Sequence, residues 1–141
     1  MASPQVIELE VRNYECDIEG IVNNAVYLNY LEHARHEYIR SLGTDFLSLH
    51  NYGTDPVVAR IEIDYRKPLV AGDRVRVESQ AFRKGRYRIL FDQRIVRTTD
   101  GVLAAEATVN VVFITNGRPV PAPAEFEGLE TDQVRFEESA R

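Results

Sequence analysis

The sequence has few of the features that would place a protein in a membrane, outside the cell or on nucleic acid. Its single cysteine, Cys16, excludes an intrachain disulfide and the ligand cluster of a structural zinc site. No apolar run approaches the roughly 18 residues that span a bilayer, and the start MASPQVIELE lacks the basic and apolar parts of a secretory signal. The net charge of -5 disfavours nucleic acid and anionic membranes as partners. We therefore expect a cytoplasmic protein that binds neither nucleic acid nor a membrane.

Several catalytic motifs are missing as well. The sequence has no glycine-rich phosphate loop and no Gly-x-Ser-x-Gly nucleophile turn, which argues against kinases, P-loop proteins and α/β-hydrolases. His33, His36 and Glu37 can share one helical face, but no HExxH pattern is present. Mixed ligands of this kind on an exposed helix more commonly form a solvated face than a metal site. We expect neither a metal nor another cofactor.

The residues that are present fit one folded domain. Hydrophobic residues make up 44% of the chain and charged residues 28%, a balance typical of folded proteins. Alternating apolar and charged residues predict a strand over residues 5–11, and a four-three-four-four spacing predicts a helix from Asn23 or Asn24 to a cap at Gly43. The apolar face of this helix consists of Tyr27, Leu31, Ala34, Tyr38 and Leu42.

The second half of the chain has the composition of strands. A short helix or turn is expected over residues 44–53, followed by strands over 57–65, 74–83, 87–97 and 102–115, the last three joined by hairpin turns at Gly85 and Gly101. Together the elements predict an α+β domain with one long helix against one antiparallel sheet. We assign residues 1–127 to this domain and residues 128–141 to an acidic, flexible tail.

Candidate chemistry is concentrated in the loop NYECDIEGIVNN, residues 13–24. Asp17 precedes the helix start, where unpaired backbone N–H groups carry a partial positive charge that can polarise a carbonyl oxygen. A carboxylate there can accept a proton from water or attack an acyl carbon directly. Gly20 permits the left-handed backbone of a tight loop. From these residues alone, however, an aspartate before a helix is more commonly a cap or a solvated loop residue than a catalytic one.

This loop and the following helix resemble the signature of the 4-hydroxybenzoyl-CoA thioesterase family of hotdog proteins. That signature is an aspartate, two free positions, Gly-Ile/Val-Val and then a helix with tyrosine, and the resemblance covers residues 5 to 115. The residues that carry it are Tyr14 to Val22, Tyr27, Leu28, Glu32, Ala34, Arg35, Tyr65, Pro68, Gly72, Asp73 and the strand after Gly101. The resemblance implies a five-stranded antiparallel sheet wrapped around one long helix, and a homodimer or homotetramer with active sites between subunits.

The same resemblance implies a reaction and a set of site residues. The reaction is hydrolysis of an acyl-CoA, with Asp17 as general base or nucleophile and the backbone N–H of Asn24 on the thioester carbonyl. Gly20 and Asn23 are expected to contact the substrate. Where the His-Val-Asn-Asn form of long-chain acyl thioesterases has histidine, this chain has Ile21, so the resemblance does not specify the acyl group. An asparagine side chain at the helix start can bind the carbonyl or a water, or cap the helix, and both roles stay open.

A second candidate site is the basic turn RKGRYR, residues 83–88. Coenzyme A carries phosphates, so Lys84, Arg86 and Arg88 are candidates for binding them, although a solvated turn explains the same residues equally well. A basic turn also suits the acidic surface of an acyl carrier protein, which makes hydrolysis on that carrier one alternative. A hotdog module that binds acyl-CoA without hydrolysing it is another.

Overall fold

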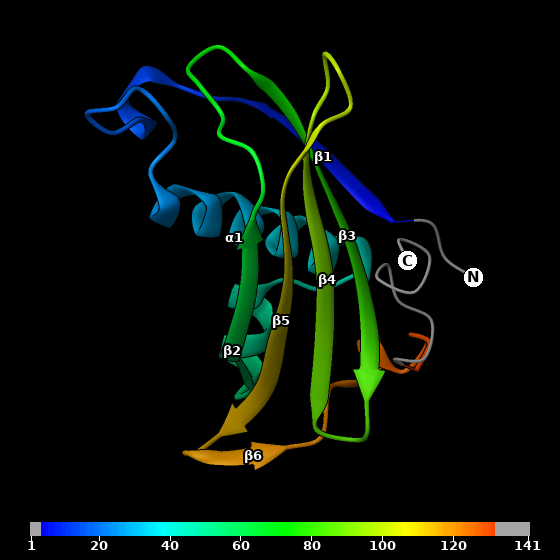
Figure 1. Ribbon diagram of the computed structural model, residues 1–141. Helices are drawn as coiled ribbons and strands as arrows, with labels where there is room; N and C mark the ends of the chain where they lie inside the picture. The colour runs from blue at the N-terminus through cyan, green and yellow to red at the C-terminus, as the bar shows by residue number, and fades with distance from the viewer. Residues whose placement is uncertain (1–3, 132–141) are drawn as a thin grey trace.

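The computed structural model describes residues 4–131, and its main feature is an antiparallel sheet curled around one long helix (Figure 1). The strands run in the order β1-β3-β4-β5-β2, and a short β6 pairs with β5 outside this path. This is the five-stranded hotdog arrangement that the resemblance implied, with one short strand added. In chain order the elements are β1 (Gln5–Glu10), a 3₁₀ turn (Asn13–Glu15), α1 (Asn24–Ser41), α2 (Phe46–Tyr52), β2 (Asp55–Tyr65), β3 (Arg74–Lys84), β4 (Arg88–Arg97), β5 (Leu103–Thr115), β6 (Arg118–Val120) and a second 3₁₀ turn (Ala124–Phe126).

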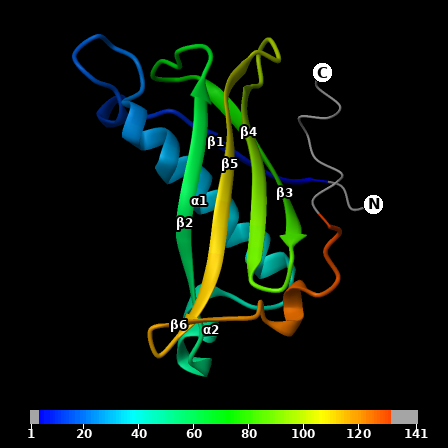
Figure 2. The same cartoon turned by 60° about the horizontal axis from the view of Figure 1, so that its bottom comes forward.

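Helix α1 lies across the concave face of the sheet, and the strands pass in front of it in both ribbon views (Figure 1, Figure 2). Asn23 caps its start and Gly43, with a φ of 94°, follows its end, as the sequence predicted. Of the predicted apolar face, Tyr27, Leu31, Ala34 and Tyr38 are buried. Burial of each large side chain contributes roughly 1.5–3 kcal/mol, so this face anchors α1 to the sheet.

The core consists of two clusters, one at each end of α1. The first packs Tyr27 and Leu31 against the start of β3 and the end of β4, beside the predicted chemical loop. The second packs Tyr38 against Phe91, and Phe113 against Phe126 of the segment after β6. The loop that carries Asp17 therefore lies next to a well-packed end of the sheet.

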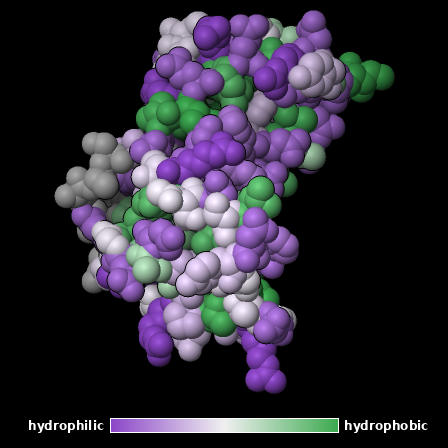
Figure 3. All heavy atoms as spheres, turned by 180° about the vertical axis from the view of Figure 1, so that it is seen from behind, coloured by the Kyte–Doolittle hydropathy of each residue, from purple (hydrophilic) through white to green (hydrophobic). Residues whose placement is uncertain are grey.

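The remaining surface and the end of the chain add three observations. Seen from the helix side, small groups of hydrophobic residues are separated by hydrophilic ones (Figure 3). No helix within residues 4–131 is long and apolar enough to cross a membrane.

Most of the expected acidic tail, residues 132–141, lies outside the described residues. The Arg83 N–H donates to the Glu130 carbonyl at 2.8 Å, so residues just before 132 contact β3. The boundary between domain and tail stays a prediction.

Candidate active site

Asp17 lies at the base of a short turn. Cys16 and Val22 form an antiparallel bridge, and the Asp17 N–H donates to the Ile21 carbonyl at 2.8 Å. Gly20 has a φ of 81° and its N–H donates to the Asp17 carbonyl at 3.0 Å. The Asp17 Oδ1 accepts the Glu19 N–H at 2.8 Å. One carboxylate oxygen is thus oriented by the turn, while no hydrogen bond to Oδ2 is found within residues 4–131.

The first turn of α1 contains the helix cap Asn23 and the backbone donor of Asn24. The Asn23 Oδ1 accepts the Ala25 N–H at 2.9 Å, and the Asn23 carbonyl accepts the Val26 N–H at 2.9 Å. Asn23 therefore caps the helix. The Asn24 N–H makes no hydrogen bond in the described part of the chain, residues 4–131. A donor at a helix N-terminus carries part of the positive end of the helix dipole, so it can stabilise a developing oxyanion.

Asp17 and this helix start line the same pocket, which has a volume of about 540 Å³. The Tyr65 hydroxyl donates to the Asn24 carbonyl at 2.9 Å, and its ring lies edge-on to the Tyr27 ring at 5.1 Å. Burial raises the pKa of the Tyr27 phenol, which therefore stays neutral and serves as a wall. The lining residues are Asp17, Ile21, Val22, Asn23, Asn24, Tyr27, Tyr65, Arg66, Lys67 and Pro68.

The connection between β2 and β3, residues 66–73, supports the turn that carries Asp17. Val22 N–H donates to the Leu69 carbonyl at 2.8 Å, and Ile21 forms an antiparallel bridge with Val70. These contacts attach the turn to a second segment. The position of Asp17 over the pocket therefore depends on how firmly this connection is held.

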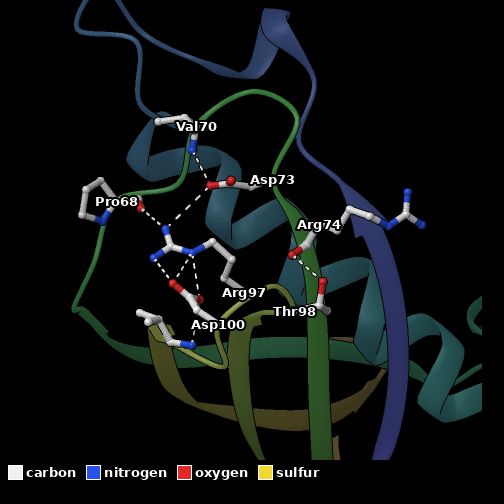
Figure 4. A network of polar contacts seen from close by, with 8 residues as sticks. Pro68, Val70, Asp73, Arg74, Arg97, Thr98 and Asp100 are labelled. Carbon is white, nitrogen blue, oxygen red and sulfur yellow. Dashed lines mark hydrogen bonds and ion pairs between the residues drawn. The ribbon is translucent and has the colours of Figure 1, made fainter.

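An arginine at the end of β4 holds the connection (Figure 4). Arg97 donates to the Asp100 carboxylate through Nε at 3.0 Å and through Nη2 at 2.8 Å. Its Nη1 lies 3.5 Å from the Pro68 carbonyl and 3.8 Å from the Asp73 carboxylate. The same Asp73 carboxylate accepts the Val70 N–H at 2.9 Å. One guanidinium thus connects the β4–β5 turn to both ends of the segment that supports the site.

Two cationic residues, Arg66 and Lys67, line the pocket, and they differ in their ion pairs. Arg66 pairs with Glu106 at 2.6 Å and with Asp64 at 3.8 Å. Lys67 is exposed and makes no ion pair within residues 4–131, so its charge is available to an anionic group. No group of three or more His, Cys, Asp or Glu side chains in this same range is arranged to hold a metal ion.

The structure brings some predicted site residues together and separates others. Asp17, Asn23 and Asn24 share the pocket, and Gly20 forms the turn beside it without lining it. Lys84, Arg86 and Arg88 lie at the β3–β4 turn, at the other end of β3 from the connection that supports Asp17. Eleven residues of strand span roughly 35 Å. Within one chain, the basic turn and Asp17 therefore belong to different regions, and phosphate binding at this turn stays a prediction.

Sequence reasoning missed the role of Tyr65 and Arg66 as pocket residues. Tyr65 is separated from Asn24 by 41 positions, and only the order of strands in the sheet brings them into contact. Its only signal was its place among the residues that carry the family resemblance. Arg66 had no signal of its own, because an arginine at a strand end is usual on a solvated surface.

Several known proteins resemble this chain over most of its length. A family model described as "Thioesterase-like superfamily" matches residues 11–128. A chloroplastic acyl-acyl carrier protein thioesterase of Arabidopsis thaliana is 34% identical over 119 residues, which cover 84% of this chain and 63% of that protein. The chain thus spans less than two thirds of that relative. An acyl-CoA thioesterase of Haemophilus influenzae is 34% identical, covering 80% of this chain and 84% of its own.

A solved thioesterase structure has a fold similar to that of this chain. A thioesterase from Thermus thermophilus, complexed with coenzyme A and Zn, superposes with a TM-score of 0.75 at 33% identity. The match covers 88% of this chain and 94% of the other. The similarity therefore extends over the whole sheet and helix rather than over one motif.

Proposed function

Because the chain belongs to the thioesterase-like superfamily, we propose that it hydrolyses acyl-coenzyme A thioesters to a free acid and coenzyme A. The observation that carries the proposal is that Asp17 and Asn24, whose N–H makes no hydrogen bond within residues 4–131, line one pocket. The names of the Haemophilus and Thermus proteins, one an acyl-CoA thioesterase and the other a thioesterase complexed with coenzyme A, support it. Fold similarity alone would not assign an activity, and the site geometry supplies the chemical argument.

The reaction follows from the two groups. The thioester carbonyl oxygen accepts the Asn24 N–H, and the negative charge that develops on this oxygen is stabilised by the α1 N-terminus. Asp17 takes a proton from water as the water oxygen attacks the acyl carbon. When the C–S bond breaks, the sulfur of coenzyme A leaves with the electron pair and takes the proton from Asp17, which gives the thiol and restores the carboxylate. The alternative is attack by the Asp17 carboxylate itself, giving a mixed anhydride that water then hydrolyses.

Isotope labelling can detect the route through Asp17. In a single turnover in H₂¹⁸O, attack by Asp17 followed by hydrolysis at its carboxyl carbon places ¹⁸O in the peptide that contains residue 17. Label found only in the free acid would indicate either direct attack by water or hydrolysis of the anhydride at the acyl carbon. Mass spectrometry of the digested protein and of the product would measure both.

The carrier of the acyl group has a second candidate. The Arabidopsis relative is named for acyl-acyl carrier protein, and the exposed cations Lys84, Arg86 and Arg88 favour contact with an acidic carrier surface. Lys67 at the pocket serves either carrier, because both present a phosphate next to the pantetheine arm. Comparing rates on acyl-CoA and acyl-carrier substrates with the same acyl chain would decide between them. The cytoplasmic location expected from the sequence also stays a prediction.

We also propose that the active unit is a homodimer formed through β2. This strand lies at one edge of the sheet, and its outer N–H and C=O groups are available to a second copy. Tyr65, the last residue of β2, lines the pocket, so pairing there would bring a second subunit next to Asp17. Two subunits contributing to one site would also allow a basic turn that is remote in one chain to approach the substrate.

The direct test of the proposed function is a thiol-release screen over short, long and aromatic acyl-CoAs with wild type and Asp17→Asn. We expect the variant to bind substrate but to lose about two to four orders of magnitude in kcat, the usual contribution of a positioned base. Glu10→Gln is the matched control, because it makes the same carboxylate-to-amide change at an exposed ion pair with Arg74. Near-normal hydrolysis by Asp17→Asn would contradict the proposal, and tight binding of acyl-CoA by a wild type that releases no thiol would indicate a binding module instead.

A further inference from the structure

We propose that Glu15 is a positioning residue that fixes the Asp17 turn to α1 at two separate points. The inference rests on the proposed function, since it assigns a purpose to geometry around Asp17. It concerns a residue that touches neither the pocket nor the reacting atoms, and that therefore acts through the backbone of the turn.

The side chain of Glu15 makes the first attachment. Glu15 is only 9% exposed, and its Oε1 accepts the Tyr30 hydroxyl at 2.7 Å and the Arg12 N–H at 2.8 Å. Its Oε2 accepts Arg12 Nη1 at 3.1 Å. Tyr30 is 3% exposed and belongs to the second turn of α1, so its hydroxyl is itself held by the core. The carboxylate is therefore bound to a fixed point on the helix.

The main chain of Glu15 makes the second attachment. Its carbonyl accepts the Asn23 N–H at 2.9 Å, and Asn23 is the cap of the same helix. Asn23 and Tyr30 are seven positions apart, or roughly 10 Å along a helix axis. A single hydrogen bond would let the turn pivot, whereas two attachments this far apart fix its orientation. Asp17 follows two residues later, and the Asn24 N–H one residue after the cap.

The surroundings of the Glu15 carboxylate favour its charged form. Burial by itself raises the pKa of the Glu15 carboxyl, but hydrogen bonds from Arg12 and Tyr30 outweigh this effect, and the net result is a lowered pKa. Burial and the Glu15 charge together raise the pKa of Tyr30. Glu15 is therefore ionised and Tyr30 protonated at neutral pH. The hydrogen bonds that the Glu15 carboxylate accepts from Tyr30 and Arg12 are thus charge-assisted.

A stabilising role and a positioning role predict different results. If Glu15 only stabilised the fold, its loss would lower the melting temperature and leave kcat unchanged well below that temperature. A positioning residue changes kcat at such temperatures, because a displacement of about 1 Å between reacting groups can cost about 100-fold in rate. KM should change little, because Glu15 does not line the substrate pocket.

The test uses two variants that weaken the side-chain attachment, one on the turn and one on α1. Glu15→Gln loses the charge and places an amide N–H₂ against the Arg12 guanidinium, and Tyr30→Phe loses the 2.7 Å bond while keeping the ring. We expect each to lower kcat by about 10- to 100-fold with KM within about 3-fold, and the double variant to fall short of the product of the two effects. Glu10→Gln is the control for the charge change. Tyr30→Phe decides alone if Glu15→Gln does not fold.

A second readout does not depend on activity. Hydrogen exchange should show faster exchange of the Asp17 and Asn23 amides in Glu15→Gln than in wild type or Glu10→Gln. Unchanged protection, or a kcat of both site variants equal to that of Glu10→Gln, would overturn the inference. If wild type hydrolyses no thioester, the proposed function fails, and the exchange rates alone decide whether Glu15 positions the turn.

Discussion

Asn23 is the residue at which capping and substrate binding can be separated. Serine keeps an oxygen that can cap the helix but lacks the side-chain N–H₂ of the pocket residue Asn23. We expect Asn23→Ala to lower the free energy of unfolding by about 1 kcal/mol and Asn23→Ser to change it by much less. Asn23→Ser should nevertheless raise KM several-fold. Urea unfolding and steady-state kinetics measure the two effects, and an unchanged KM would reduce Asn23 to a helix cap.

Gly20 offers a comparison of the same substitution at two ends of the molecule. Gly20 and Gly117 have φ values of 81° and 76°, and an added Cβ would meet no atom within 4 Å at either position. Alanine should therefore cost about 1 kcal/mol of stability at both, through backbone strain alone. Only Gly20→Ala distorts the turn that holds Asp17, so only this variant should lose activity, by about 10-fold or more. Equal activity of the two variants would show that the turn tolerates the change.

At the scale of elements, Arg97 should control how firmly residues 66–73 support the site. Arg97→Lys keeps the charge but loses the fork that reaches Asp100, Pro68 and Asp73 together. We expect about 1 kcal/mol of lost stability and faster exchange of the Val22 N–H, which bonds to the Leu69 carbonyl. Arg74→Lys is the control, because Arg74 pairs with Glu10 at an exposed site where the same change should cost little. Similar exchange of Val22 in both variants would contradict the assignment.

The elements themselves were largely predictable, for identifiable physical reasons. The alternation in β3 and the four-residue spacing in α1 each record a buried face, and the caps at Asn23 and Gly43 mark where α1 begins and ends. Observed boundaries lie within about two residues of the expected ones, the usual uncertainty at element ends. Residue pattern thus predicted α1 and β3 because each of these two elements buries one side.

Contacts between distant elements were not predictable in the same way. Arg35 is a charged helix residue, yet it is 5% exposed and donates to Gln93, 58 positions away, which in turn donates to Ser79 and the Leu31 carbonyl. The partner of a buried polar group depends on strand order, which no local pattern encodes. Tyr65 was absent from the predicted site for the same reason. Asp17 and Asn24 could be proposed together from the sequence because the residues between them form one continuous motif.

At the scale of the whole molecule, the two outer strands differ in what they offer a second copy. β1 has 6 residues, whereas β2 has 11 and carries Val57 and Val58 at 44% and 42% exposure. A long, apolar outer strand is a pairing surface that natural proteins either cover or use. Because β2 ends at the pocket residue Tyr65, using it for assembly would couple the oligomeric state to the site.

We therefore expect wild type to run at twice the chain mass of 16.1 kDa or a multiple of it, and Val58→Asp to run as a monomer with reduced kcat. If two β2 strands pair about a two-fold axis, the new aspartate of one copy lies close to the same aspartate of the other copy. The two negative charges would repel each other and weaken the pairing. Val6→Asp on β1 is the matched control, because Val6 is 45% exposed on the other outer strand. Light scattering after gel filtration measures the mass. Dissociation by Val6→Asp rather than by Val58→Asp would move the interface to β1, and a monomeric, fully active wild type would show that the Asp17 site is complete within one chain.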